Sequence, residues 1–168
     1  MEKPKEPEHL RVYNWRTEEW LLIDWYHKLV TSGDMNTTMM FDMRYLSNFL
    51  LYFRPKVTLA YASDSDGIWF ASWVEPFMAG AFFGLWIRQD KRHTPSAYRL
   101  LSEAYDEAFK VFTVLIGISC QEHLRDIHRK MGYSHLGTVP AIWDGNPADV
   151  YFMTREMWEA KNGRRRQK

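Results

Sequence analysis

A short polar stretch, RQDKRHTPSA at residues 88–97, holds the residue types that could bind an anion such as a phosphate. A guanidinium group can hold a phosphate with two parallel hydrogen bonds. The basic residues of the stretch are Arg88, Lys91, Arg92 and His93. Thr94 and Pro95 then look like the start of a helix, where unpaired backbone N–H groups favour an anion. A solvated basic turn before an ordinary helix is the alternative, and the sequence leaves both interpretations open.

Two further side chains could take part in proton transfer or nucleophilic attack. His128 can exchange a proton near neutral pH, but it lies in an apolar stripe at helical spacing, where a packing role is the more common one. Cys120 is the single cysteine, which excludes an internal disulfide and a multi-cysteine zinc site. Because no histidine and acid accompany it at a recognisable spacing, we interpret Cys120 as a small buried side chain. We predict no metal site.

The first half of the chain predicts one strand followed by two helices. Residues 11–15 are short, alternating and aromatic, which is typical of a strand. Residues 17–30 predict a helix with acids in its first turn and Gly33 just beyond its end. Residues 42–53 place apolar side chains on one helical face, and Pro55 ends that run.

Three strands come next. Residues 56–63 and 68–74 alternate around a DSDG turn and predict a hairpin. EPFMAG, at 75–80, predicts a second turn. Residues 81–87 are almost entirely apolar, which indicates a strand covered on both faces.

The second half changes to helical spacing and then returns to strands. Residues 94–112 predict the strongest helix, and 113–119 predict a buried strand, so the pair forms a right-handed parallel crossover with the strand before it. Another amphipathic helix runs to Gly132, and residues 134–143 and 149–158 predict a closing strand pair.

These elements predict an α/β fold with a mixed central sheet of about six to seven strands, flanking helices and one central parallel crossover. A chain of 168 residues with 46% hydrophobic residues is long enough for one compact domain, which we place at 1–160. The basic segment 161–168, KNGRRRQK, is expected to be a disordered tail.

Composition limits the partners. Lysine and arginine total 22 against 21 acids, so no overall electrostatic field attracts nucleic acid. The basic tail could add nonspecific affinity for nucleic acid, but a short basic tail is usually just solvated. No segment approaches the ~20 apolar residues that span a bilayer, so we expect no membrane partner. The single cysteine fits a reducing cytoplasm, which is the location we expect. Aromatic residues reach 16%, which fits an aromatic core or a docking surface.

The element order and one motif resemble the GCN5-related N-acetyltransferase (GNAT) family. The stretch QEHLRDIHRKMGYSHLG, at 121–137, is similar to that family's "N..A..FY.K.GF...G" helix and turn. Gly132 and Tyr133 stand at its Gly-Phe position, and Gly137 follows. The resemblance in element order covers roughly the whole chain.

The resemblance implies acetyl-CoA as the acyl donor. In the family, backbone N–H groups at the start of the crossover helix hold the pyrophosphate through the motif [RQ]-x-x-G-x-[GA], which aligns here with residues 92–97. Arg92 and Ala97 match the motif, whereas Pro95 replaces the central glycine and removes one N–H donor. The residues implied to bind the cofactor are Arg88, Arg92, Ser96, Ala97 and Gln121.

The resemblance also implies catalytic roles. The family's thiolate-protonating tyrosine aligns with His128, which could act as the acid, and the amine needs a general base. The strand at 81–87 carries no carboxylate, so Glu75 and His93 are the candidates for that base. Asp90 also lies beyond the far end of that strand, and for all three residues the role of an ordinary turn residue is the more common one.

Two functions therefore stay open. One is transfer of an acetyl or acyl group from acyl-CoA to a primary amine. The other is a non-catalytic protein of the same fold that has lost CoA binding, such as an assembly or virion component of a bacteriophage, located in the host cytoplasm or the virion. Exposed aromatic side chains would permit a homodimer or a larger protein assembly.

Overall fold

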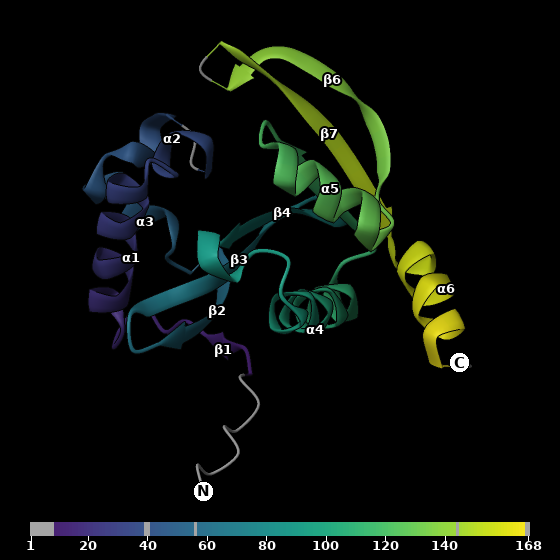
Figure 1. The fold of residues 1–168 in the computed structure, drawn as a ribbon, viewed down its shortest axis with the longest axis horizontal. Coiled ribbons are helices and arrows are strands. Elements are labelled where there is room, and N and C mark those ends of the chain that lie inside the picture. Colours follow the sequence, from purple (N-terminus) through teal and green to yellow (C-terminus); the bar gives the residue numbers. More distant parts are fainter. Residues whose placement is uncertain (1–8, 39–40, 56, 144, 167–168) are drawn as a thin grey trace, which may run out of the picture.

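The computed structural model describes residues 9–38, 41–55, 57–143 and 145–166. A seven-stranded sheet forms its centre, in the order β1-β2-β3-β4-β5-β7-β6 (Figure 1). The strands are β1 (Arg11–Val12), β2 (Thr58–Asp64), β3 (Gly67–Phe77), β4 (Gly80–Ile87), β5 (Val114–Ser119), β6 (Ser134–Trp143) and β7 (Asn146–Thr154). The helices are α1 (Glu19–Ser32), α2 (Met35–Thr38), α3 (Leu46–Tyr52), α4 (Pro95–Val111), α5 (Glu122–Met131) and α6 (Arg155–Arg166), with short 3₁₀ turns η1 (Phe41–Arg44) and η2 (Gln89–Lys91).

The sheet is mixed, as predicted. Strands β1 to β4 pair antiparallel, and so do β5 with β7 and β6 with β7. Strands β4 and β5 are the parallel pair, and α4 connects them. The predicted α/β fold class, with one central parallel crossover, is confirmed.

The last element differs from the prediction. We expected the closing strand to continue to 158 and a disordered tail over 161–168, whereas β7 ends at Thr154 and helix α6 runs on to Arg166. Thr154 Oγ1 accepts a hydrogen bond from the Met157 amide, which caps the new helix. Trp158 then enters the core with 2% of its surface exposed, and its Nε1 donates to Asp106 Oδ1 at 2.7 Å. Residues 167 and 168 lie outside the described residues.

The core consists of two clusters of apolar side chains. Trp25 of α1 is fully buried at the centre of the first, where its ring contacts Phe49, Phe53, Trp73 and Trp86 at centroid distances of 5.4 to 5.9 Å. The second cluster joins α4, α5 and α6 to the strands. Many of the aromatic residues thus serve as core, which is the first of the two roles that the composition suggested.

No described helix has the length and apolar character needed to cross a membrane.

Candidate active site

A cavity opens where the two parallel strands separate. Phe82 of β4 and Ile116 of β5 form the last residue pair between these strands, although β4 continues to Ile87 and β5 to Ser119. The cavity has a volume of about 380 Å³ and receives side chains from α2, η1, α3, β3, β4, β5 and α5. Much of its wall is apolar, including Met43, Phe82, Phe83, Leu85, Ile116 and Ile118. A concave apolar site with a few polar groups is typical of a small-molecule site.

Glu75 is the only carboxylate among the described residues that line the cavity. We expected it in a turn, but β3 runs through to Phe77, and Glu75 pairs across the sheet with Phe82 at the mouth of the strand separation. Tyr52 of α3 donates a hydrogen bond from Oη to Glu75 Oε2 at 2.7 Å. That contact fixes the carboxylate against the wall and leaves acceptor capacity on its oxygens.

Trp73 forms an aromatic wall beside Glu75. Its indole lies directly over Gly84 of the neighbouring strand, where an added Cβ would sit 1.9 Å from Trp73 Cε2. Because even an alanine would collide with the ring, glycine at 84 is what lets the indole lie flat on β4. Trp73 is also held from behind by Trp25 and Phe53.

His128 lies in the cavity wall and is buried, with 5% of its surface exposed. Its ring fits between Gly117 and Tyr151, stacking on Tyr151 at a centroid distance of 4.6 Å. Burial lowers its pKa to about 4, so the imidazole is neutral at pH 7. Its Nδ1 has no hydrogen-bond partner among the described residues. His128 is therefore in place for a role at the cavity, but as a neutral ring rather than as an imidazolium acid.

Gln121 and Thr38 meet at the edge of the cavity. Gln121 precedes α5, and its Nε2 donates to Thr38 Oγ1 at 3.5 Å. Thr38 is buried and lines the cavity, so this contact joins α2 to the start of α5. The partly buried Gln121 amide is thus in contact with another side chain of the protein.

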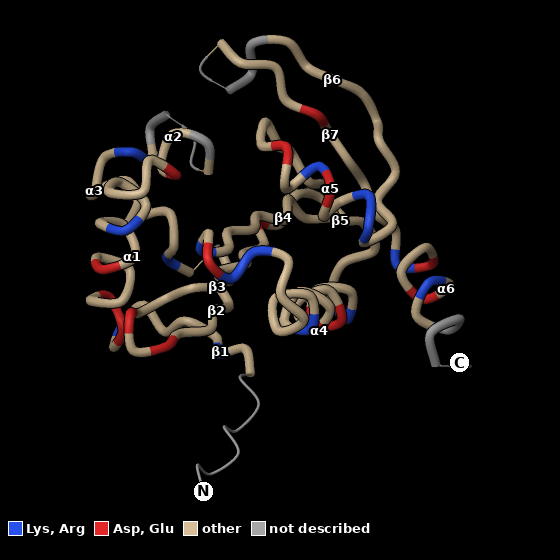
Figure 2. The backbone as a smooth tube through the Cα atoms, viewed as in Figure 1, with Lys and Arg blue, Asp and Glu red and all other residues tan. Residues whose placement is uncertain are grey.

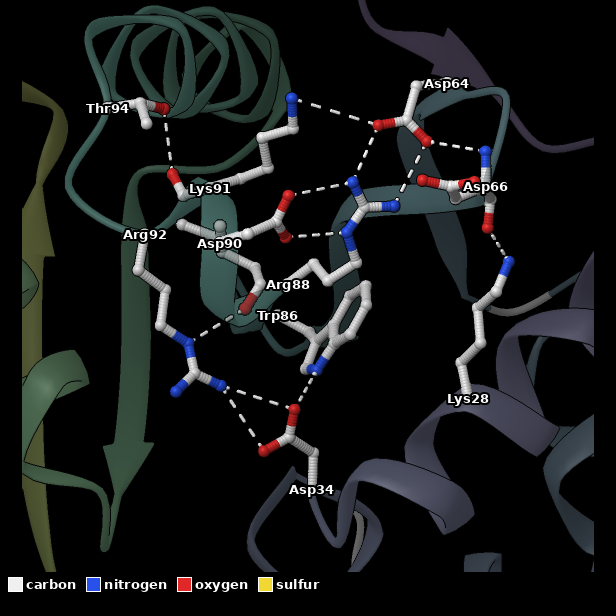
Figure 3. Close-up of polar contacts among 11 residues, drawn as sticks. Lys28, Asp34, Asp64, Asp66, Trp86, Arg88, Asp90, Lys91, Arg92 and Thr94 are labelled. Atoms are coloured by element: carbon white, nitrogen blue, oxygen red, sulfur yellow. Dashed lines mark hydrogen bonds and ion pairs between the residues drawn. The ribbon is translucent and has the colours of Figure 1, made fainter.

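The basic corner at 88–92 is paired with carboxylates of the same chain (Figure 3). Arg88 donates two hydrogen bonds to Asp64, at 3.1 and 2.7 Å, and two to Asp90, at 2.7 and 3.1 Å. These bonds raise the pKa of Arg88 and lower those of Asp64 and Asp90. Lys91 Nζ lies 3.9 Å from Asp64 Oδ2. Figure 2 shows basic and acidic positions side by side in this corner.

Arg92 is engaged in the same way on the other side of the corner. Its Nη2 lies 3.3 Å from both carboxylate oxygens of Asp34, in the turn after α1, and its Nε donates to the Ile87 carbonyl at 3.0 Å. Trp86 Nε1 donates to the same Asp34 carboxylate at 2.9 Å. Arg92 thus fastens the end of β4 to the turn after α1 (Figure 3).

The first turn of α4 satisfies most of its own donors. Thr94 is the cap, as predicted, because its Oγ1 accepts from the Ala97 amide at 3.2 Å and its carbonyl from the Tyr98 amide at 3.2 Å. Pro95 has no N–H. Among the first-turn amides, only that of Ser96 has no acceptor within the described part of the chain.

His93 stands apart from the cavity. It is exposed, adopts a positive φ of 64°, and its Nδ1 lies 3.3 Å from Tyr98 Oη. Of the three residues predicted for catalysis, the structure therefore places Glu75 and His128 at one cavity and His93 outside its lining.

Comparison with solved structures identifies the fold. The ribosomal-protein-S5-alanine acetyltransferase from Vibrio fischeri superposes with a TM-score of 0.70 at 8% sequence identity, over 93% of this chain and 97% of that one. A mutant of the spermidine N-acetyltransferase SpeG from Vibrio cholerae gives 0.66 at 10% identity, over 91% and 98%. The chain has the N-acetyltransferase fold.

The aminoglycoside 6'-acetyltransferase type Ii is also similar, with a TM-score of 0.64 at 16% identity, over 86% of this chain and 96% of that one. No protein-family model and no curated protein sequence matches the chain. The expected resemblance to the GNAT family is thus confirmed as a likeness of fold.

The two ends of an acetyl-CoA molecule, the donor that the resemblance implied, would meet different surroundings here. The apolar cavity between β4 and β5 suits an acyl group and the alkyl amide arm next to it. The corner expected to hold the pyrophosphate offers one first-turn amide and cations already bound to carboxylates. The residues present therefore fit the thioester end and do not fit the pyrophosphate end.

Sequence reasoning missed the partners of the site residues. Tyr52, Asp34 and Asp64 come from elements distant in sequence, and no local pattern marks them as neighbours of Glu75, Arg92 and Arg88. The DSDG turn was noted only as a turn, although its first residue supplies the carboxylate for Arg88.

Proposed function

We propose that this protein is an N-acyltransferase that moves an acyl group from an acyl thioester, with acetyl-CoA as the first donor to test, to a primary amine. One observation carries the proposal: Glu75, oriented by Tyr52, stands at the cavity where the parallel strands of an N-acetyltransferase fold separate. A base at that position can reach an amine placed against an acyl group in the cavity.

Glu75 is preferred over His93 as the base because of where the two side chains lie. Glu75 lines the cavity, whereas His93 is exposed at the start of α4. The carboxylate accepts one proton from the ammonium group of the substrate, and the neutral amine nitrogen then attacks the acyl carbon. As the C–N bond forms and the C–S bond breaks, the second proton of that nitrogen passes to the sulfur, which leaves as a thiol. Neutral His128 can donate a hydrogen bond from its ring N–H to the sulfur that leaves.

The walls near Glu75 favour a particular kind of amine. Tyr52, Trp73 and Phe82 supply aromatic surface around a single carboxylate, and aromatic faces attract an ammonium group. A polyamine would need several acids to pair its charges, and Glu75 is the only one in the described lining. We therefore expect a monoamine with an apolar body, such as 2-phenylethylamine, to be acetylated faster than spermidine.

The test is thiol release from acetyl-CoA by the full chain with a panel of primary amines. Glu75→Gln should lower the rate about 100-fold, the lower end of what a general base contributes. Glu107→Gln is the matched control, because Glu107 is exposed on α4 and pairs only with Lys110 among the described residues. An equal effect of both variants would contradict the role of Glu75.

If acetyl-CoA produces neither calorimetric heat nor thiol release with any amine, the proposal fails, and the non-catalytic alternative, a structural or assembly protein of this fold, takes its place.

A further inference from the structure

The cations beside the start of α4 are bound to carboxylates of this chain. We propose that the protein recognises its donor through the acyl-pantetheine arm, and that the nucleotide end of CoA adds little affinity. This inference rests on the proposed acyl transfer and specifies the substrate class: an acyl-pantetheine thioester, with or without a nucleotide attached.

The charges of the corner cancel. Its three cations face three carboxylates, and the closest contacts are 2.7 Å for Arg88 with Asp64 and 3.3 Å for Arg92 with Asp34. The side chains of these two pairs are only 15% to 21% exposed, so solvent weakens their attraction less than it would at an open surface. The cations are Arg88, Lys91 and Arg92, and the carboxylates are Asp34, Asp64 and Asp90.

A diphosphate would have to displace these carboxylates. If Arg88 turned to a phosphate, Asp64 would lose its bidentate partner and stand next to a second anion. If Arg92 turned, Asp34 would keep Trp86 Nε1 but lose the guanidinium, and the link from Arg92 to the Ile87 carbonyl would break. Each exchange replaces one charged hydrogen-bonded pair with another, so the net gain in affinity is small.

The start of α4 offers few hydrogen-bond donors that could compensate a diphosphate for the paired cations. Ala97 and Tyr98 donate their amides to Thr94, and Pro95 has none. Within the first turn of α4, the Ser96 amide is the one without an acceptor in the described part of the chain. By contrast, the cavity presents apolar side chains along the path between the strands, including Leu85, Ile116, Ile118 and Leu124. Binding affinity for the donor is therefore concentrated on the arm and the acyl group.

The test compares two donors on the intact protein. Calorimetry should give dissociation constants for acetyl-CoA and S-acetylpantetheine that agree within about tenfold, a difference of about 1.4 kcal/mol or less. The ratio of these two dissociation constants should change little between low and high salt, because the protein makes few ionic contacts to the phosphates of acetyl-CoA.

A charge variant sharpens the comparison. Asp90→Asn removes an exposed carboxylate from Arg88 and should tighten acetyl-CoA binding about two- to fivefold, the effect of one surface ion pair, with S-acetylpantetheine unchanged. Glu107→Gln makes the same charge change on the exposed surface of α4 and should alter neither constant.

The outcomes separate the two proposals. Acetyl-CoA binding more than about 100-fold tighter than S-acetylpantetheine, a difference of about 2.7 kcal/mol, would overturn this inference and leave acyl transfer standing. Equal binding of both donors without acetylation of any amine would support the inference and refute the proposed transfer. If neither donor binds, both proposals fall together.

Discussion

Acidification should destabilise the protein through His128. The imidazole has an ordinary pKa of 6.5, and burial lowers it to about 4 in the folded state. Between these values the unfolded chain binds more protons than the folded one, so the free energy of unfolding decreases as the pH falls. Between pH 7 and pH 4.5 this one group should remove about 2 kcal/mol of stability.

His128→Phe isolates that contribution. Phenylalanine keeps a ring between Gly117 and Tyr151 but does not titrate, so its own packing cost is the same at both pH values. Urea unfolding at pH 7 and pH 4.5 should show a loss of stability that is about 2 kcal/mol smaller in the variant than in the wild type. Burial and the charge of Arg92 also lower the pKa of His123 to about 4. His123 is present in both proteins, so its contribution cancels in the comparison.

Exposed His27 provides the control, because His27→Asn should leave the acid sensitivity of the wild type in place. The reasoning is refuted if His128→Phe loses as much stability on acidification as the wild type does. That result would mean that the folded protein accommodates the imidazolium without cost.

Three further substitutions test the surroundings of the site. Gly84→Ala should push Trp73 off β4 and cost about 1 to 3 kcal/mol in chemical denaturation, with a change in tryptophan fluorescence; an unchanged spectrum would contradict the contact. Thr94→Ala should cost about 1 kcal/mol by removing the cap of α4, and Thr94→Ser should recover most of it. Asp34→Asn should lower the free energy of unfolding by about 1 to 2 kcal/mol, because Arg92 loses its carboxylate, whereas Asp126→Asn on the surface of α5 should change it by less than about 0.5 kcal/mol.

The fold could be predicted largely because its signals are local. The DSDG turn, the apolar run at 81–87 and the Thr94-Pro95 helix start each specify their element from a few neighbouring residues. The prediction failed at residue 155, where REMW was taken as the end of a strand. There the outcome depends on a distant contact, since Trp158 of α6 is buried and bonded to Asp106 of α4.

The site was harder to predict because its chemistry depends on pairing across the sheet. Glu75 was a candidate base only by proximity in sequence, and its hydrogen bond from Tyr52 spans 23 positions of the chain. The basic stretch at 88–93 left a phosphate site and an ordinary turn open. The carboxylates that neutralise it lie 24 and 58 positions away for Arg88 and Arg92, beyond the reach of any local pattern.

The basic corner at 88–92 also explains how a protein of this fold stays stable when the start of α4 does not bind an anion. A helix start that binds an anion must leave donors unpaired when the anion is absent, and unpaired donors cost stability. In this chain Pro95 removes one donor and Thr94 accepts two others, while Arg92 joins Asp34 to the end of β4. The groups that would lower the affinity for a diphosphate therefore stabilise the free protein. Replacing a carboxylate of the corner should accordingly lower the stability of the protein and raise its affinity for the nucleotide.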